Sequence, residues 1–181
     1  MQNTKTYSLI LMICGLVGIF TSFMLTLDKI ELLKNPAVQL PCNVNPIISC
    51  GPVILTPQAS AFGVPNPMLG LIGFSIVFTI GLVLISGAKI ENLKFWAIFN
   101  IGVTAAILFI HWLIFQSIYQ IGALCIYCMI TWTVTWPVFL YSIKNYFNNS
   151  FLNRNHVAIL IGWYLIIILL ILSHFRNFFF G

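Results

Sequence analysis

The chain has 181 residues, of which 60% are hydrophobic and only 6% are charged, so its composition is that of a membrane protein. Soluble domains carry about 25% charged residues, which excludes a soluble enzyme or binding domain. Eight Lys and Arg against three Asp and Glu give a formal net charge of +5. No basic cluster with interleaved aromatic residues is present, so this excess indicates oriented membrane spans and no nucleic-acid binding.

Five uncharged stretches follow one another along the chain, each close to the roughly 20 apolar residues that a helix needs to cross the hydrocarbon. We predict membrane spans over residues 7–27, 68–86, 95–115, 123–143 and 156–175. All eleven Asp, Glu, Lys and Arg residues (8 + 3) fall outside these stretches. The predicted fold class is therefore an all-α integral membrane protein, with residues 1–181 forming one membrane domain.

The longest connection, residues 28–67, holds Cys42, Cys50 and seven of the eight prolines. Such a density of proline forbids a long regular helix. Residues 47–62 are rather apolar, and we expect them to cap the bundle or to lie on the bilayer surface as short helical turns. Cys42 and Cys50 can form a disulfide only if the chain between them folds back, and the Asn-Pro step within it is a suitable turn.

Basic residues suggest how the spans are oriented. The side of the N-terminus holds Lys5, Lys89, Lys94, Lys144 and Arg154, and the other side holds Lys29, Lys34 and Arg176. Because basic loops tend to stay in the cytoplasm, we predict a cytoplasmic N-terminus. The 28–67 connection and a short turn predicted over residues 116–122 then face outward. This orientation brings four of the five cysteines to the same membrane face.

The fourth predicted span opens with a Cys-x-x-Cys motif, Cys125 and Cys128. Residues three apart share a helix face, so this spacing permits a reversible disulfide or a metal clamp. Backbone N–H groups and the helix dipole at a helix N-terminus lower the pKa of a cysteine, which favours a Cys125 thiolate. Cys128 lies one turn deeper, where it can meet a lipid-soluble electron acceptor. We predict that the two cysteine pairs exchange electrons, with the loop pair acting as a mobile shuttle.

Three segments carry a resemblance to a known family: residues 41–50 (PCNVNPIISC), residues 65–70 (PNPMLG) and residues 125–128 (CIYC). They resemble the vitamin K epoxide reductase family, in its bacterial disulfide-forming branch, and the resemblance covers roughly residues 7–143. It implies a four-helix bundle that encloses a quinone, either ubiquinone or menaquinone. The fifth span is expected to lie at the periphery of this bundle.

The resemblance also implies a role for each paired cysteine. Cys42 would meet a thioredoxin-like protein, Cys50 would exchange with Cys125, and Cys128 would face the quinone. Some relatives carry a fused thioredoxin-like domain, whereas this chain ends after the fifth predicted span, which implies a separate periplasmic or extracytoplasmic partner. The implied protein is a quinone-dependent thiol oxidoreductase of the cell inner membrane that supports disulfide-bond formation.

Four further residues are candidates for the quinone site. Asn66 matches a family position that hydrogen-bonds a quinone carbonyl, and Thr56 matches a small hydroxyl position in the capping segment. Trp132 stands where relatives that reduce vitamin K epoxide have a tyrosine, so the resemblance implies quinone rather than epoxide reduction. His111 lies near the outer end of the third span, at the depth of a quinone ring, and is a candidate for proton delivery. Hydrogen bonding between helices also accounts for a histidine at that depth.

Two other classes of function stay open at this point. Four thiolates bind soft cations, so the chain could be a heavy-metal carrier, although no histidine stands beside any of the four cysteines. It could also be a noncatalytic membrane assembly factor, which would tolerate replacement of Cys125 and Cys128 by serine. Cys14, alone inside the first span, fits a small buried apolar side chain.

Overall fold

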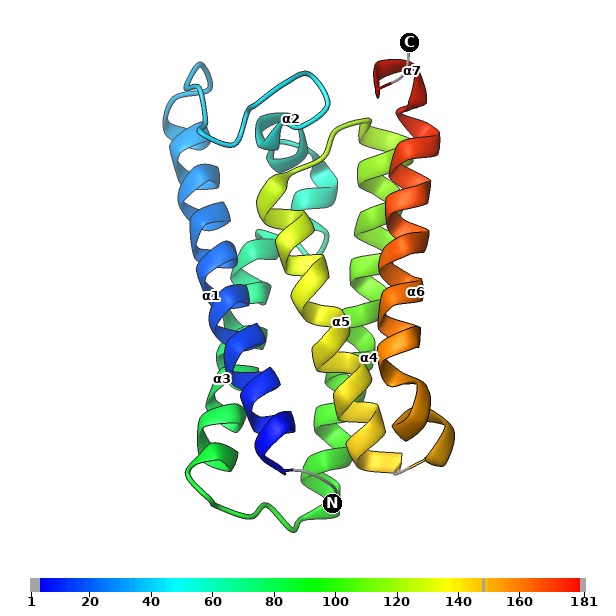
Figure 1. Ribbon diagram of the computed structural model, residues 1–181. Coiled ribbons are helices and arrows are strands. Elements are labelled where there is room, and N and C mark those ends of the chain that lie inside the picture. The colour runs from blue at the N-terminus through cyan, green and yellow to red at the C-terminus, as the bar shows by residue number, and fades with distance from the viewer. Residues whose placement is uncertain (1–3, 148, 180–181) are drawn as a thin grey trace.

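The computed structural model describes residues 4–147 and 149–179, which form a bundle of helices (Figure 1). The five helices that are long and apolar enough to cross a membrane are α1 (Thr4–Lys34), α3 (Asn66–Ile85), α4 (Leu93–Phe115), α5 (Ile126–Phe147) and α6 (Ser150–His174). Four short elements are α2 (Cys50–Ile54), the 3-10 turn η1 (Pro57–Ser60), the π-helical turn η2 (Gln116–Ile121) and α7 (Arg176–Phe179). The described ranges contain one isolated β-bridge and no strand, which confirms the predicted all-α membrane fold.

The bundle is built around α1 and α5. Helix α1 packs along α3 and α5, and α5 also packs along α4 and α6. None of the described residues of α6 is fully buried, whereas α3, α4 and α5 each bury several side chains. Helix α6 therefore lies outside a four-helix bundle of α1, α3, α4 and α5, against its α4–α5 side (Figure 1).

Glycines allow α1 and α3 to approach each other closely. A Cβ atom at Gly15 would lie 2.7 Å from the backbone of Phe78, and one at Gly81 would lie 2.6 Å from the nitrogen of Met12. Real Cβ atoms do not come this close to a backbone, so a side chain at either position would separate the two helices. Helices α1 and α3 thus form one tightly packed wall of the bundle.

Helix α1 is longer than the first predicted span. The sequence predicts a connection from residue 28, but the helix continues to Lys34. Leu25, Asp28 and Leu32 recur at helical spacing and are all buried, so one face of α1 stays packed beyond the uncharged stretch. This correction moves Asp28 from a loop onto a helix that runs beneath the cysteine-bearing connection.

The passage from α4 to α5 also differs from the prediction. In place of a turn over residues 116–122, α4 continues through η2 and stops at Gly122, whose φ of 70° ends the helix. The next three residues precede α5, which begins at Ile126 rather than at residue 123. The Cys125 carbonyl accepts a hydrogen bond from the Met129 N–H at 3.0 Å, so Cys125 is the residue that caps α5.

Candidate functional site

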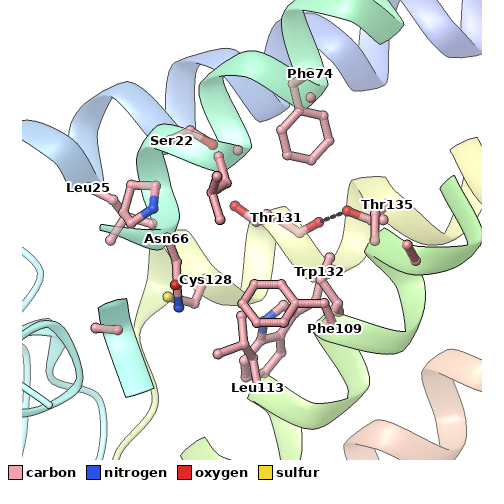
Figure 2. A pocket seen from close by; sticks show the side chains of 18 of the residues that line it. Ser22, Leu25, Asn66, Phe74, Phe109, Leu113, Cys128, Thr131, Trp132 and Thr135 are labelled. Carbon is pink, nitrogen blue, oxygen red and sulfur yellow. Dashed lines mark hydrogen bonds between the residues drawn. The ribbon is translucent and has the colours of Figure 1, made fainter. Parts of the chain in front are cut away.

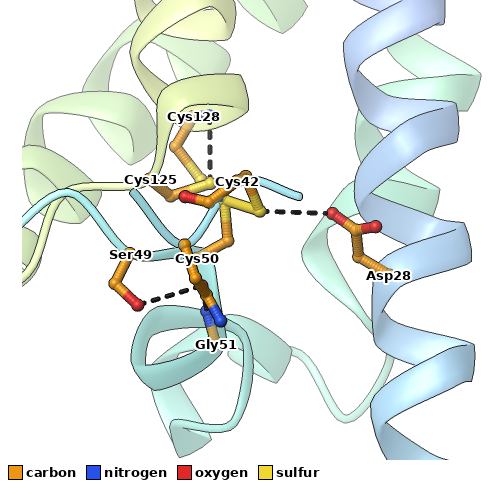
Figure 3. The surroundings of a disulfide bond; sticks show 8 residues. Asp28, Cys42, Ser49, Cys50, Gly51, Cys125 and Cys128 are labelled. Carbon is orange, nitrogen blue, oxygen red and sulfur yellow. Dashed lines mark hydrogen bonds between the residues drawn. A yellow bond between two sulfur atoms is a disulfide. The ribbon is translucent and has the colours of Figure 1, made fainter. Parts of the chain in front are cut away.

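Cys42 and Cys50 form a disulfide, with their Cα atoms 5.7 Å apart. The chain between them folds back at Asn45, whose side-chain oxygen accepts hydrogen bonds from the backbone N–H groups of Ile47 (2.9 Å) and Ile48 (2.7 Å). This is the Asn-Pro turn that the sequence predicts between the two cysteines. It makes residues 42–50 a compact loop closed by its own disulfide (Figure 3).

Main-chain hydrogen bonds hold this loop against the segment that leads into α5. The Leu124 N–H donates to the carbonyl of Ile47 at 2.7 Å, and the Ser49 N–H donates to the carbonyl of Leu124 at 2.9 Å. These two bonds form the parallel bridge between Ile48 and Leu124. Leu124 directly precedes Cys125, and Ser49 directly precedes Cys50, so the bridge sets the two cysteine pairs side by side.

The four paired cysteines meet at one end of the bundle. Cys42, Cys50 and Cys125 are 3%, 0% and 0% exposed and belong to one buried cluster, against which Cys128 packs. Leu25, Leu32, Leu40 and Ile54 complete the cluster. Cys125 and Cys128 are free thiols. The sequence predicts the shared membrane end, and the structure adds that Cys125 packs in the same cluster as the Cys42–Cys50 disulfide (Figure 3).

Cys125, which precedes the membrane-spanning helix α5, has surroundings that favour its thiolate form. Its sulfur accepts a hydrogen bond from the Cys128 backbone N–H at 3.4 Å. Hydrogen bonding by the Cys128 thiol, followed by backbone N–H groups at the start of α5, lowers the pKa of Cys125 although burial opposes this change. A lowered pKa gives the larger thiolate fraction that disulfide exchange needs.

A cavity of about 600 Å³ lies between α1, α3, α4 and α5, beneath the segment that contains α2 and η1 (Figure 2). Most of its lining is apolar, with few polar side chains. Figure 2 labels Ser22, Leu25, Asn66, Phe74, Phe109, Leu113, Cys128, Thr131, Trp132 and Thr135 around it. Cys128 is the one cysteine of the described chain that lines this cavity, so the sulfur cluster and the cavity meet at its side chain.

Three of the four candidate quinone residues also line the cavity: Thr56, Asn66 and Trp132. The Asn66 amide donates to the carbonyl of Gln58 at 2.7 Å and accepts from the Ala61 N–H at 3.1 Å. Asn66 therefore holds the segment that caps the cavity as well as lining it. Trp132 is buried on the α5 side (Figure 2).

His111 does not line the cavity, although the sequence made it a candidate for proton delivery to a quinone there. Its Nδ1 is 2.7 Å from the carbonyl oxygen of Ile107, and its Nε2 accepts a hydrogen bond from Trp163 Nε1 of α6 at 3.0 Å. His111 thus takes part in a hydrogen bond between two helices, which is the alternative that the sequence left open. Its partner was not foreseeable, because no spacing rule relates two residues on different helices.

Sequence reasoning also missed Asp28 as a member of the cysteine site. Its carboxylate lies 3.6 Å from the Cys42 sulfur, and the residue is buried (Figure 3). The available signal was the spacing of Leu25, Asp28 and Leu32, which continues the buried face of α1 past the uncharged stretch that ends at Leu27.

Comparison with known protein families matches residues 9–143 to the vitamin K epoxide reductase family. The chain belongs to this family. The match includes all four paired cysteines and the residues that line the cavity, and it ends before α6. A comparison with curated proteins found no match. Membership of the family makes this multi-pass membrane protein a thiol oxidoreductase.

Proposed function

We propose that this protein oxidises the dithiol of a separate thioredoxin-like protein outside the cytoplasm and reduces a membrane quinone. The observation that carries this proposal is that the four cysteines form one continuous group from the loop to the cavity. The Cys42–Cys50 disulfide and Cys125 share one buried cluster, and Cys128 joins that cluster to the cavity. Electrons that enter at the loop therefore need only exchanges between neighbouring sulfurs to reach the cavity.

The first exchange takes place with the partner protein. A partner thiolate attacks the Cys42 sulfur and breaks the Cys42–Cys50 bond, and the second partner thiol then releases Cys42 as the partner becomes oxidised. Cys42 is buried, but the neighbouring Pro41 is exposed and Val44 is 64% exposed, so a modest movement of this segment uncovers the sulfur. The loop pair is left as a dithiol, having gained two electrons.

The second exchange passes these electrons to the helix pair. The Cys50 thiolate attacks Cys125 of an oxidised Cys125–Cys128 pair and releases Cys128 as a thiolate, and Cys42 then attacks Cys50 and frees Cys125. The products are a Cys42–Cys50 disulfide and two free thiols at Cys125 and Cys128, the same pattern as in the structure. Dividing the transfer into covalent steps lets each sulfur attack a close neighbour.

The cavity suits a quinone in size and chemistry. It is largely apolar, holds about 600 Å³, and presents Cys128 at one wall. Asn66, Thr56 and Trp132 would hold the ring; among the described residues, the Trp132 indole N–H has no hydrogen-bond acceptor and can donate one bond. When bound, a quinone accepts two electrons and two protons. The protein contributes the thiolate, the orientation and a cavity that excludes water.

We further propose that the protein lies in the inner membrane with a cytoplasmic N-terminus. In Figure 1 the beginning of α1 and the α3–α4 connection, together with the last turn of α5 and the first turn of α6, lie at the end opposite the disulfide loop. Five basic residues, Lys5, Lys89, Lys94, Lys144 and Arg154, belong to that end, and more basic residues favour the cytoplasmic side. The sulfur cluster then faces the compartment in which disulfides form.

The test is quinone reduction by purified protein, with either a reduced thioredoxin-like protein or a small dithiol as electron donor. We expect Cys128→Ser to reduce turnover with both donors by a factor on the order of 10³ or more, because the last sulfur before the cavity is lost. Cys42→Ser should stop turnover with the protein donor but spare the small dithiol that can reach Cys125. Cys14→Ser is the matched control, since Cys14 is buried in α1 away from the sulfur cluster.

Absence of turnover by wild-type protein with both ubiquinone and menaquinone analogues would contradict the proposal. Equal activity of wild type and Cys128→Ser would also contradict it, and would favour a noncatalytic assembly role.

A further inference from the structure

Asp28 is a buried carboxylate placed against the loop disulfide. The residue is 6% exposed, and its Oδ2 atom lies 3.6 Å from the Cys42 sulfur. The carboxylate and the sulfurs of Cys42 and Cys50 all lie within 4.8 Å of one another, and all three residues are buried. Figure 3 shows the carboxylate of α1 directed at this disulfide from the side opposite α5.

No cationic side chain of the described residues compensates Asp28. The ammonium group of the neighbouring Lys29 is held elsewhere, donating to the carbonyl of Ile54 at 2.9 Å and to the Ser60 hydroxyl at 3.2 Å. Glu31, one turn further along α1, is exposed and has the same sign of charge. Buried carboxylates in proteins are ordinarily protonated, paired with a cation or bound to a metal, so Asp28 is free to act as a metal ligand.

Opening the disulfide would complete a set of metal ligands. Two thiolates would then stand beside the carboxylate, and thiolate and carboxylate oxygen are both ligands of zinc. At zinc distances of about 2.3 Å to sulfur and 2.0–2.2 Å to oxygen, tetrahedral geometry places a sulfur and an oxygen roughly 3.5 Å apart. The observed separation of 3.6 Å between Cys42 Sγ and Asp28 Oδ2 therefore needs little change.

We propose that Asp28 and the reduced forms of Cys42 and Cys50 make up a binding site for one zinc ion, a site that the disulfide keeps closed. Binding replaces the two thiol protons, which are released, and transfers no electrons. Three protein ligands leave a fourth position open. The inference rests on the proposed function only in that the loop disulfide must be reducible; it does not require a quinone.

Zinc at this site would inhibit the protein in a redox-dependent way. Zinc bound to Cys42 and Cys50 occupies both sulfurs, so neither can attack Cys125 or a partner disulfide. The metal can enter only after electrons have arrived at the loop and before they have moved on to the helix pair. Zinc would accordingly inhibit most when the supply of dithiol exceeds that of the electron acceptor.

The test is a zinc titration of the full chain in detergent, in a Cys125→Ser/Cys128→Ser background that leaves the loop pair as the reducible disulfide. We expect one zinc per chain after reduction with a phosphine and none while the disulfide is intact. Asp28→Asn, which keeps the shape of the side chain, should weaken binding at least about 10-fold. Glu31→Gln is the matched control on the same helix and should bind as the parent does.

Cadmium provides a second readout, because its thiolate charge-transfer absorption should appear on reduction and reach its maximum at one equivalent. Formation of the Cys42–Cys50 disulfide in Asp28→Asn verifies that the loop still folds. Equal zinc affinity of Asp28→Asn and Glu31→Gln, or equal binding by oxidised and reduced protein, overturns the site. Either result leaves the proposed quinone reduction unaffected. If the protein binds zinc in an Asp28-dependent way but reduces no quinone, only the proposed function is overturned.

Discussion

Helices α4 and α5 form a pair with two faces that carry similar residues. One face borders the cavity, and the other packs against α6. On one face, Cys128, Trp132 and Gly102 border the cavity. On the other face, His111 and Trp136 are covered by Trp163 of α6. An aromatic or ionisable residue in a membrane helix therefore does not by itself indicate a ligand site. What decides is whether the neighbouring helix fills the space in front of it.

The α6 face is filled by aromatic rings. The ring centroids of Trp136 and Trp163 are 4.8 Å apart, and those of His111 and Trp136 are 5.7 Å apart. The family match ends at residue 143, before α6 begins at Ser150. The cavity face thus belongs to the part of the chain that the family shares, and the α6 face is formed with a helix outside the match.

The strongest test of this difference adds a side chain at the cavity and, as a control, one on α6 outside the cavity. A Cβ atom at Gly102 or at Gly162 would meet nothing within 4 Å, but only Gly102 lines the cavity. We expect Gly102→Leu to raise the KM for quinone by about 10- to 100-fold, since overfilling a packed site costs about 1–3 kcal/mol. Gly162→Leu on α6 should leave this KM unchanged. The measurement is steady-state quinone reduction with a small dithiol as donor.

An unchanged KM in Gly102→Leu, with the thermal unfolding midpoint also unchanged, would show that the quinone binds elsewhere. Equal increases in Gly102→Leu and Gly162→Leu would remove the distinction between the two faces.

A smaller effect should separate two tryptophans that lie one turn apart on α5. Trp132 lines the cavity, whereas Trp136 contacts His111 and Trp163. We expect Trp132→Phe to raise the KM for quinone roughly threefold, equivalent to about 0.6 kcal/mol of lost binding. Among the described residues, the buried indole N–H of Trp136 has no hydrogen-bond partner, so Trp136→Phe breaks no hydrogen bond and should keep the KM of the parent. A larger KM change in Trp136→Phe than in Trp132→Phe would reverse this assignment.

The smallest effect on quinone binding is expected at the contact between α4 and α6. Trp163→Phe removes the hydrogen bond of 3.0 Å to His111, which should lower the free energy of unfolding by about 1 kcal/mol. Turnover and the KM for quinone should remain those of wild type, because His111 lies outside the cavity. Unfolding in a mild denaturant gives the stability, and the same quinone assay gives the KM. A large loss of turnover without a loss of stability would restore His111 to the reaction.

Much of the fold follows from the sequence because the bilayer imposes one strong requirement on it. Five uncharged stretches of sufficient length gave five long apolar helices. The ends of these helices were harder to predict, since hydropathy reports where hydrocarbon begins and not where a helix stops. Asp28 shows this difference: a charge ends the uncharged stretch there, yet packing of Leu25 and Leu32 continues the helix to Lys34.

The residue pattern predicted that the four cysteines lie at one membrane end, whereas only the family resemblance pointed to residues that line the cavity. The positions of Cys42, Cys50, Cys125 and Cys128 relative to the predicted spans placed them together, because charge bias and span count both constrain topology. Which side chains enclose a cavity depends on how far apart helices pack, and no sequence pattern reports that distance. His111 was therefore assigned to the right depth of the bundle but not to its true neighbours.

The bridge between Ile48 and Leu124 changes how the sulfur exchange can be pictured. Its two hydrogen bonds involve only main-chain atoms, so no cysteine sulfur takes part in them. Cys50 and Cys125 are each attached one residue beyond this fixed point. In this structure the loop is anchored beside Cys125, whereas the sequence predicts a mobile shuttle. In the proposed relay, the sulfurs that this bridge holds side by side would exchange with little motion of the loop except at the edge where a partner arrives.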